Sequence, residues 1–193
     1  MAVIIPQYNS IFVHIPKTGG TSIQRWLLDN TNAHVTKGSK HHSLDLLEQR
    51  YGKFNFSFAV VRNPWDWCVS WYFFRRDRAL RRIKNPKNKG KFNTEYNQKI
   101  LKDFEKGFEY FIKTTNLKPQ SYRVQGVDYI IKLENIYKDI IPIKKRFSIE
   151  SELPYLNKST REKDYRNYYT STSKNIVAEK FNDDIIKFGY EFW

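Results

Sequence analysis

Three short runs of β-branched and aromatic residues predict strands. They are residues 10–15 (SIFVHI), 58–61 (FAVV) and 129–133 (YIIKL). Pro16 ends the first run, and Asn63-Pro64 follows closely after the second. Short apolar runs between such turn residues are typical of strands that are buried in a sheet.

Apolar positions at helical spacing predict the elements that follow these strands. A helix is expected over residues 21–30, with Thr21 or Ser22 as its N-cap. The other predicted helices start near Trp65 and cover residues 97–115 and 173–188, the last closed by Gly189. Strands that alternate with helices predict an α/β fold with a mainly parallel central sheet flanked by helices, in three layers. The length of 193 residues predicts a single domain over residues 1–193.

The charge balance predicts an anionic partner. Thirty-four Lys and Arg against twenty Asp and Glu give a formal charge of +14, which suits a nucleotide, a nucleic acid, an acidic polysaccharide or lipid headgroups. Residues 75–91 carry nine Lys or Arg and one acidic residue. This basic stretch is either a solvated surface or a binding surface for an acidic acceptor, and the sequence leaves both interpretations open.

The sequence contains no sign of an oxidising compartment or of a membrane. Cys68 is the one cysteine, so no intrachain disulfide can form, and its place on an apolar helix face predicts a packing role. No apolar run approaches the roughly 20 residues that cross a bilayer. The first residues lack the basic start of a signal peptide. We therefore expect a soluble cytoplasmic protein.

The segment His14-Ile15-Pro16-Lys17-Thr18-Gly19-Gly20-Thr21-Ser22 predicts an anion site. A strand enters a two-glycine turn and then a helix, so unpaired amides and the positive end of the helix dipole meet at one place. Lys17 adds a full positive charge. This is P-loop-like, but the nucleoside-triphosphate motif has its lysine after the glycines, whereas here the lysine precedes them.

A second segment places an arginine and a hydroxyl near the same sheet edge. Arg62 ends a predicted strand, and Ser70 follows eight residues later on the next helix. A parallel sheet binds ligands at the carboxyl ends of its strands. A guanidinium and a hydroxyl together can hold a phosphate.

Together the two segments resemble the sulfotransferases that use 3′-phosphoadenosine 5′-phosphosulfate (PAPS), above all the heparan and chondroitin (carbohydrate) branch. PKTGGTS resembles the family's 5′-phosphosulfate loop, and VRNPWDWCVSWY resembles its 3′-phosphate motif. Weaker similarity continues, in order, through residues 127–129, 134–135, 156–160 and 188–192. One departure is Trp67, which stands where many relatives have arginine.

The resemblance assigns roles to individual positions. The residues expected to hold the 5′-phosphosulfate are Lys17, Thr18, Gly19, Gly20, Thr21 and Ser22. Arg62 and Ser70 are expected to hold the 3′-phosphate. Ser159, Thr160 and Lys163, in the stretch NKSTREK, resemble a family loop that closes over the nucleotide.

Sulfuryl transfer needs charge stabilisation and a general base. Lys17 is suited to stabilise charge on the oxygen that leaves with the nucleotide. The segment Lys40-His41-His42-Ser43 resembles the family segment in which the first histidine is the base, so His41 is expected to take the acceptor proton, with His42 as the alternative. We expect no metal cofactor, because the histidines have no acidic or cysteine partners at ligand spacing.

The acceptor is expected to be a hydroxyl-bearing molecule. The resemblance to the carbohydrate branch implies a glycan, and the basic stretch suits a glycan that carries negative charge. The product of the donor would be 3′-phosphoadenosine 5′-phosphate, and no nucleic-acid partner is expected. Lacking a membrane anchor, the chain resembles soluble microbial or viral members of the family. The sequence leaves two alternatives to a sulfotransferase: a nucleotide kinase-like enzyme, and a non-enzymatic binder of nucleic acid or acidic glycan.

Overall fold

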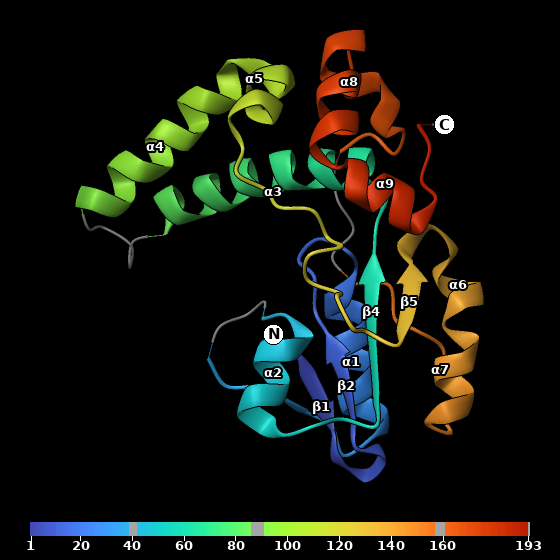
Figure 1. Ribbon diagram of the computed structural model, residues 1–193. Helices are drawn as coiled ribbons and strands as arrows, with labels where there is room; N and C mark the ends of the chain where they lie inside the picture. The colour runs from blue at the N-terminus through green and yellow to red at the C-terminus, as the bar shows by residue number, and fades with distance from the viewer. Residues whose placement is uncertain (39–41, 86–90, 157–160, 193) are drawn as a thin grey trace. The chain divides into compact units, whose positions relative to one another are not determined.

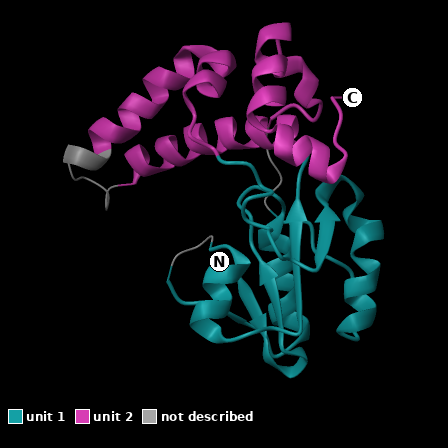
Figure 2. Cartoon of the chain, viewed as in Figure 1, with its two compact units in different colours: residues 1–63, 118–158 teal, residues 64–117, 159–193 magenta. Residues whose placement is uncertain are grey.

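The computed structural model describes residues 1–38, 42–85, 91–156 and 161–192, with the backbone alone for residues 91–93 (Figure 1). The chain forms two compact units (Figure 2), and each unit is built from two stretches of the sequence. Unit 1 comprises residues 1–63 and 118–158, and unit 2 comprises residues 64–117 and 159–193. Compactness alone does not decide whether the units fold separately, so one domain over residues 1–193 stays a prediction.

Unit 1 is an α/β unit around a sheet of five strands in the order β3-β1-β2-β4-β5. The strands are β1 (Val3–Ile5), β2 (Ser10–Val13), β3 (His34–Val35), β4 (Phe56–Val61) and β5 (Tyr129–Lys132). Its helices are η1 (Pro6–Tyr8), α1 (Gly20–Asn30), α2 (Leu44–Tyr51), η3 (Leu133–Asn135), α6 (Ile136–Asp139) and α7 (Ile141–Arg146). The α/β class and the three predicted strands are confirmed.

The prediction of a mainly parallel sheet is only partly right, because the sheet is mixed. β4 runs parallel to both β2 and β5, but β1 is antiparallel to β2 and to β3. Only η1 and Asn9, a left-handed residue with φ of 41°, separate β1 from β2. A connection this short can join antiparallel neighbours, whereas a parallel crossover needs a dozen residues or more.

The core of unit 1 lies between the sheet and the helices that follow its strands. Val3, Phe12 and Phe58 are fully buried in one core with Trp26 of α1 and with Phe147, which lies just beyond α7. Figure 1 shows α1 behind the strands and α2 in front of them. β4 is buried from Ser57 to Val61, which is expected of a central strand with parallel neighbours on both sides.

Unit 2 is helical. Its elements are α3 (Pro64–Lys84), α4 (Lys91–Glu105), α5 (Gly107–Thr114), η4 (Tyr165–Tyr168), α8 (Ser171–Lys180) and α9 (Asn182–Phe188). An aromatic cluster packs α3 against α4 and α5. Within this cluster the Tyr72 ring stacks on Phe104, with the ring centroids 4.3 Å apart. No helix in the described part of the chain is both long and apolar enough to cross a membrane.

Two predicted helices are each divided in two. The helix predicted over residues 97–115 is broken at Gly107, whose φ of 88° is outside the helical region. The helix predicted over residues 173–188 is broken at Phe181, with φ of −118°. The helical spacing of apolar residues continues across each break, because the two shorter helices on either side of it both pack their apolar sides into unit 2. Gly189 closes α9 in a left-handed conformation, as predicted.

Candidate active site

A turn of left-handed residues connects β2 to α1 and forms the candidate anion site. The loop covers residues 14–19, and both Lys17 (φ 70°) and Gly19 (φ 79°) are in the left-handed region. Turns with such residues make concave nests of backbone amides that bind anions. Gly19 is the N-cap of the 11-residue α1, so the free amides and the positive dipole end of that helix lie at the same turn.

The N-cap differs from the prediction. Thr21 or Ser22 was expected to be the N-cap, but α1 already begins at Gly20 and has no side-chain cap. The amide of Ser22 instead donates to the carbonyl of Gly19 at 3.0 Å. A left-handed glycine at the N-cap leaves the first turn without a competing side-chain acceptor, which favours an external anion there.

The hydroxyls of the loop have different surroundings. Thr18 is fully buried, and its Oγ1 donates to the carbonyl of Ile15 at 2.8 Å, so it holds the turn together. Ser22 Oγ accepts from the amide of Leu156 at 3.1 Å, which leaves its own proton to donate. Thr21 is exposed in the first turn of α1. The hydroxyls of Thr21 and Ser22 are therefore suited to an anion, while that of Thr18 stabilises the loop.

His14 packs directly against the start of α1. A Cβ atom added at Gly20 would lie 2.0 Å from Cδ2 of His14 and 2.2 Å from its Nε2. The His14 ring also stacks on Phe12, with centroids 5.9 Å apart. Glycine is thus required at position 20 because the imidazole occupies the place of a side chain.

Gly20→Ala is accordingly expected to destabilise the protein and to weaken binding of anions at the turn. The methyl group must displace the His14 ring, and overpacking of this kind costs about 1–3 kcal/mol. Urea denaturation would measure the loss. The double variant His14→Ala/Gly20→Ala should recover most of it, and a double variant as unstable as Gly20→Ala would contradict this account.

Arg62 reaches the same turn from the end of β4. Its Nη1 donates to the carbonyl of Lys17 at 3.0 Å. The side chain of the fully buried Gln120 binds both backbone groups of Arg62: Arg62 N donates to Oε1 at 3.0 Å, and Nε2 donates to the Arg62 carbonyl at 2.7 Å. The structure therefore brings Arg62 together with the residues 17–22 that were predicted from the first motif.

Arg62→Ala is expected to weaken binding of an anionic nucleotide by about tenfold to a hundredfold, since a hydrogen bond to a charged group contributes about 1.5–3 kcal/mol. Calorimetric titration of the variant would measure the change. Gln120→Glu is a useful companion, because it disturbs the backbone of Arg62 without removing the guanidinium. An affinity unchanged in Arg62→Ala would exclude this side chain from the site.

The other predicted site residues belong to other elements of the chain or fall outside the described residues. Ser70 is buried on α3 in unit 2 (8% exposed), and Lys163 is exposed in a loop of the same unit. His42 is half-buried just before α2. His41, Ser159 and Thr160 lie outside the described residues. The roles assigned to these residues stay predictions.

Trp67, the departure from the family pattern, belongs to the core of unit 2. It is 3% exposed and packs edge-to-face on Trp71 and Phe181. The neighbouring Cys68 is fully buried, which confirms the predicted packing role, and burial raises the pKa of its thiol well above the ordinary value. A thiol in this state is not a nucleophile.

Residues far apart in the sequence support the candidate site, and sequence reasoning missed them. Gln120 belongs to no motif, and the contact of Leu156 with Ser22 joins residues 134 positions apart. In unit 2, Arg161 forms an ion pair with Asp66 in the first turn of α3, and the Arg161 side chain is 7% exposed. Leu156, which donates to Ser22, and Arg161, which pairs with Asp66, are the described residues next to positions 157–160.

The α/β fold places a cationic turn at the start of α1, an arrangement suited to an anionic ligand. The chain belongs to the sulfotransferase family, whose family model matches residues 1–193. Comparisons with curated proteins and with solved structures found no match. The protein is therefore a sulfotransferase, and members of this family generally take the sulfuryl group from PAPS. The described residues contain no group of three or more His, Cys, Asp or Glu side chains that could hold a metal ion.

Proposed function

We propose that this sulfotransferase transfers the sulfuryl group of PAPS to a hydroxyl of a carbohydrate acceptor. The observation that carries the proposal is the contact of Arg62 with the Lys17 carbonyl, which puts two cationic residues at one turn of amides. PAPS carries a phosphosulfate and a separate 3′-phosphate, so it needs two groups of anion ligands. The N-terminus of α1 with Lys17 is suited to the phosphosulfate, and Arg62 at the end of β4 is suited to the 3′-phosphate.

In the proposed complex, residues 17–22 bind the 5′-phosphosulfate through backbone amides, the Lys17 ammonium and the hydroxyls of Thr21 and Ser22. Arg62 binds the 3′-phosphate. The motif VRNPWDWCVSWY assigns Ser70 to the same phosphate, and the stretch NKSTREK assigns Ser159, Thr160 and Lys163 to the nucleotide. The bond between Leu156 and Ser22 supports this last assignment, because it brings the chain before position 157 to the turn.

The proposed reaction is an in-line displacement at sulfur. The acceptor oxygen forms a bond to sulfur while the bond from sulfur to the 5′-phosphate oxygen breaks, and that oxygen keeps the electron pair. Lys17 stabilises the charge that develops on it. His41 removes the proton of the acceptor hydroxyl. The remaining contribution is positioning of the two substrates.

A carbohydrate acceptor is proposed from the branch that the motifs resemble and from the basic stretch. Within that stretch the described part of α3 carries six basic residues, of which four are exposed; the six are Arg75, Arg76, Arg78, Arg81, Arg82 and Lys84. Cations on an exposed helix end attract an acceptor that already bears carboxylate or sulfate.

The first test is calorimetric titration of the purified protein with 3′-phosphoadenosine 5′-phosphate and with ATP, both without magnesium. We expect micromolar binding of the bisphosphate and no binding of ATP. Magnesium-dependent preference for ATP would instead favour a kinase-like enzyme. Glu134 is the strand-end acid such an enzyme would use for the metal, but here its Oε1 accepts from the amide of Asn63 at 2.7 Å. Binding of RNA alone, steeply dependent on salt, would favour the non-enzymatic alternative.

A further inference from the structure

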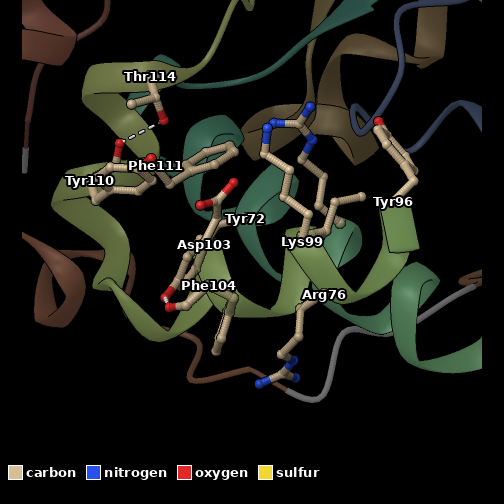
Figure 3. Close-up of a pocket in the computed structure, with 11 residues that line it drawn as sticks. Tyr72, Arg76, Tyr96, Lys99, Asp103, Phe104, Tyr110, Phe111 and Thr114 are labelled. Carbon is tan, nitrogen blue, oxygen red and sulfur yellow. Dashed lines mark hydrogen bonds between the residues drawn. The ribbon is translucent and has the colours of Figure 1, made fainter. Parts of the chain in front are cut away.

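A pocket of about 200 Å³ lies among α3, α4 and α5, entirely within unit 2 (Figure 3). Its lining combines aromatic rings, among them Tyr72, Phe104 and Phe111, with the cationic side chains of Arg75 and Lys99. None of the elements of the proposed nucleotide turn contributes to it. The pocket is therefore a second candidate site on this chain.

The aromatic rings at the pocket contact one another closely. The rings of Tyr72 and Phe104 are nearly parallel, at 18°, and the hydroxyl of Tyr72 donates to the carbonyl of Phe104 at 3.1 Å. The Phe111 ring is 5.5 Å from that of Tyr72. Burial raises the pKa of the Tyr72 phenol, so the phenol stays protonated and keeps its hydrogen bond. A wall fixed in this way loses little conformational entropy when a flat ligand packs on it.

The positive charges at the pocket are only partly neutralised. Two of the nearby cations have acidic partners: Arg76 pairs with Asp77, and Lys106 pairs with Asp103. The hydrogen bond from Lys106 lowers the pKa of the Asp103 carboxyl most, and the charges of Lys106 and Lys99 lower it further.

Arg75 and Lys99 differ from these cations. Among the residues that the structure describes, neither forms an ion pair. The guanidinium of Arg75 lies over the Phe111 ring, 5.7 Å from its centroid, which holds it at the apolar wall. Two cations beside an aromatic surface favour a ligand that has both a ring and a negative charge.

We propose that this pocket binds one six-membered ring that carries a carboxylate or a sulfate. The ring packs on the accessible apolar lining beside the Tyr72–Phe104 stack, to which Tyr96 and Ile100 contribute, and the anionic group accepts hydrogen bonds from Arg75 and Lys99. The volume agrees, since an apolar cavity of about 150 Å³ holds benzene and the remainder suits one charged substituent. The proposal holds whichever sulfuryl donor the enzyme uses. Two sources share this chemistry: the acidic sugar of a glycan and a free aromatic acid.

The test is an NMR titration of the full-length, ¹⁵N-labelled protein with glucuronate and with benzoate, each matched by a neutral ring, glucose and benzyl alcohol. We expect at least one acid to shift amides of α3, α4 and α5, and to bind about tenfold or more tightly than its neutral counterpart. The acid that binds better identifies the source. If neither acid shifts these amides at about 10 mM, or if the neutral rings bind equally well, the proposal is wrong.

Variants separate a specific site from general attraction of anions. Arg75→Gln should weaken binding of the acid about tenfold, whereas Lys102→Gln removes an equal charge from an exposed position of α4 outside the pocket and should leave binding unchanged. Equal losses in both variants would overturn the proposal. Thermal unfolding of both variants checks that they are folded. Titration of Arg75→Gln with 3′-phosphoadenosine 5′-phosphate should give the wild-type affinity. A lower affinity would mean that Arg75 belongs to the nucleotide site, and the proposal of a separate pocket would be wrong.

Discussion

Lys17→Ala is expected to lower the turnover of sulfuryl transfer by about 10²–10³-fold, the usual effect of removing one group that stabilises charge in the transition state. The half-buried Lys17 lies in the turn before α1, and the bond from Arg62 to its carbonyl fixes the backbone at this position. In the proposed complex the ammonium stabilises the phosphate oxygen on which charge develops when the bond to sulfur breaks. Affinity for 3′-phosphoadenosine 5′-phosphate should fall as well, but by less than turnover.

The measurement is turnover at saturating PAPS, combined with calorimetry of the bisphosphate. Lys17→Arg keeps the charge and should retain more activity than Lys17→Ala, although the longer planar group does not replace the ammonium fully. Lys53→Ala is the matched control, because it removes one exposed lysine of unit 1 whose pair with Glu48 is at the surface. If Lys53→Ala and Lys17→Ala lower turnover equally, net charge and not this position is responsible.

His41→Ala is expected to lower turnover by about 10²–10⁴-fold, the range that general acid–base catalysis contributes. Affinity for 3′-phosphoadenosine 5′-phosphate should stay close to that of the wild type, because the base acts on the acceptor. His42→Ala is the natural control: the two residues are adjacent, and only one can be the base. Retained turnover in His41→Ala together with loss in His42→Ala would move the assignment by one residue.

The pH dependence of turnover also tests whether His41 is the general base. A base works only when it is deprotonated, so turnover should fall at acidic pH, where a histidine base becomes protonated. The residual activity of His41→Ala should lose this acidic limb. An acidic limb that is unchanged in His41→Ala and absent in His42→Ala would identify His42 as the titrating group.

Local sequence patterns were sufficient for the elements that carry the candidate site. The strand that ends before Pro16, the Gly19-Gly20 turn and the amphipathic start of α1 are neighbours in the sequence, and their preferred backbone conformations do not depend on distant partners. The same holds for Arg62 at the end of β4. An anion-binding turn could therefore be predicted from these contiguous residues alone.

Contacts between distant residues could not be predicted in this way. Gln120 binds the backbone of Arg62 across 58 positions, and nothing in the sequence near Gln120 marks it as a partner. His14 was expected to lie within a strand, yet its ring determines that position 20 must be glycine. Both depend on how strands and loops pack, which a single sequence does not encode as a local pattern.

The sequence by itself therefore determined the α/β class, the glycine turn before α1 and the sulfotransferase family resemblance, because each rests on short-range backbone preferences or on a contiguous motif. Only the tertiary structure decided that β1 and β3 make the sheet mixed, that Gln120 holds Arg62 beside Lys17, and that α3, α4 and α5 enclose an aromatic, cationic pocket. Those features arise where segments far apart in the chain bury their side chains together, and the free energy of that burial depends on the whole fold.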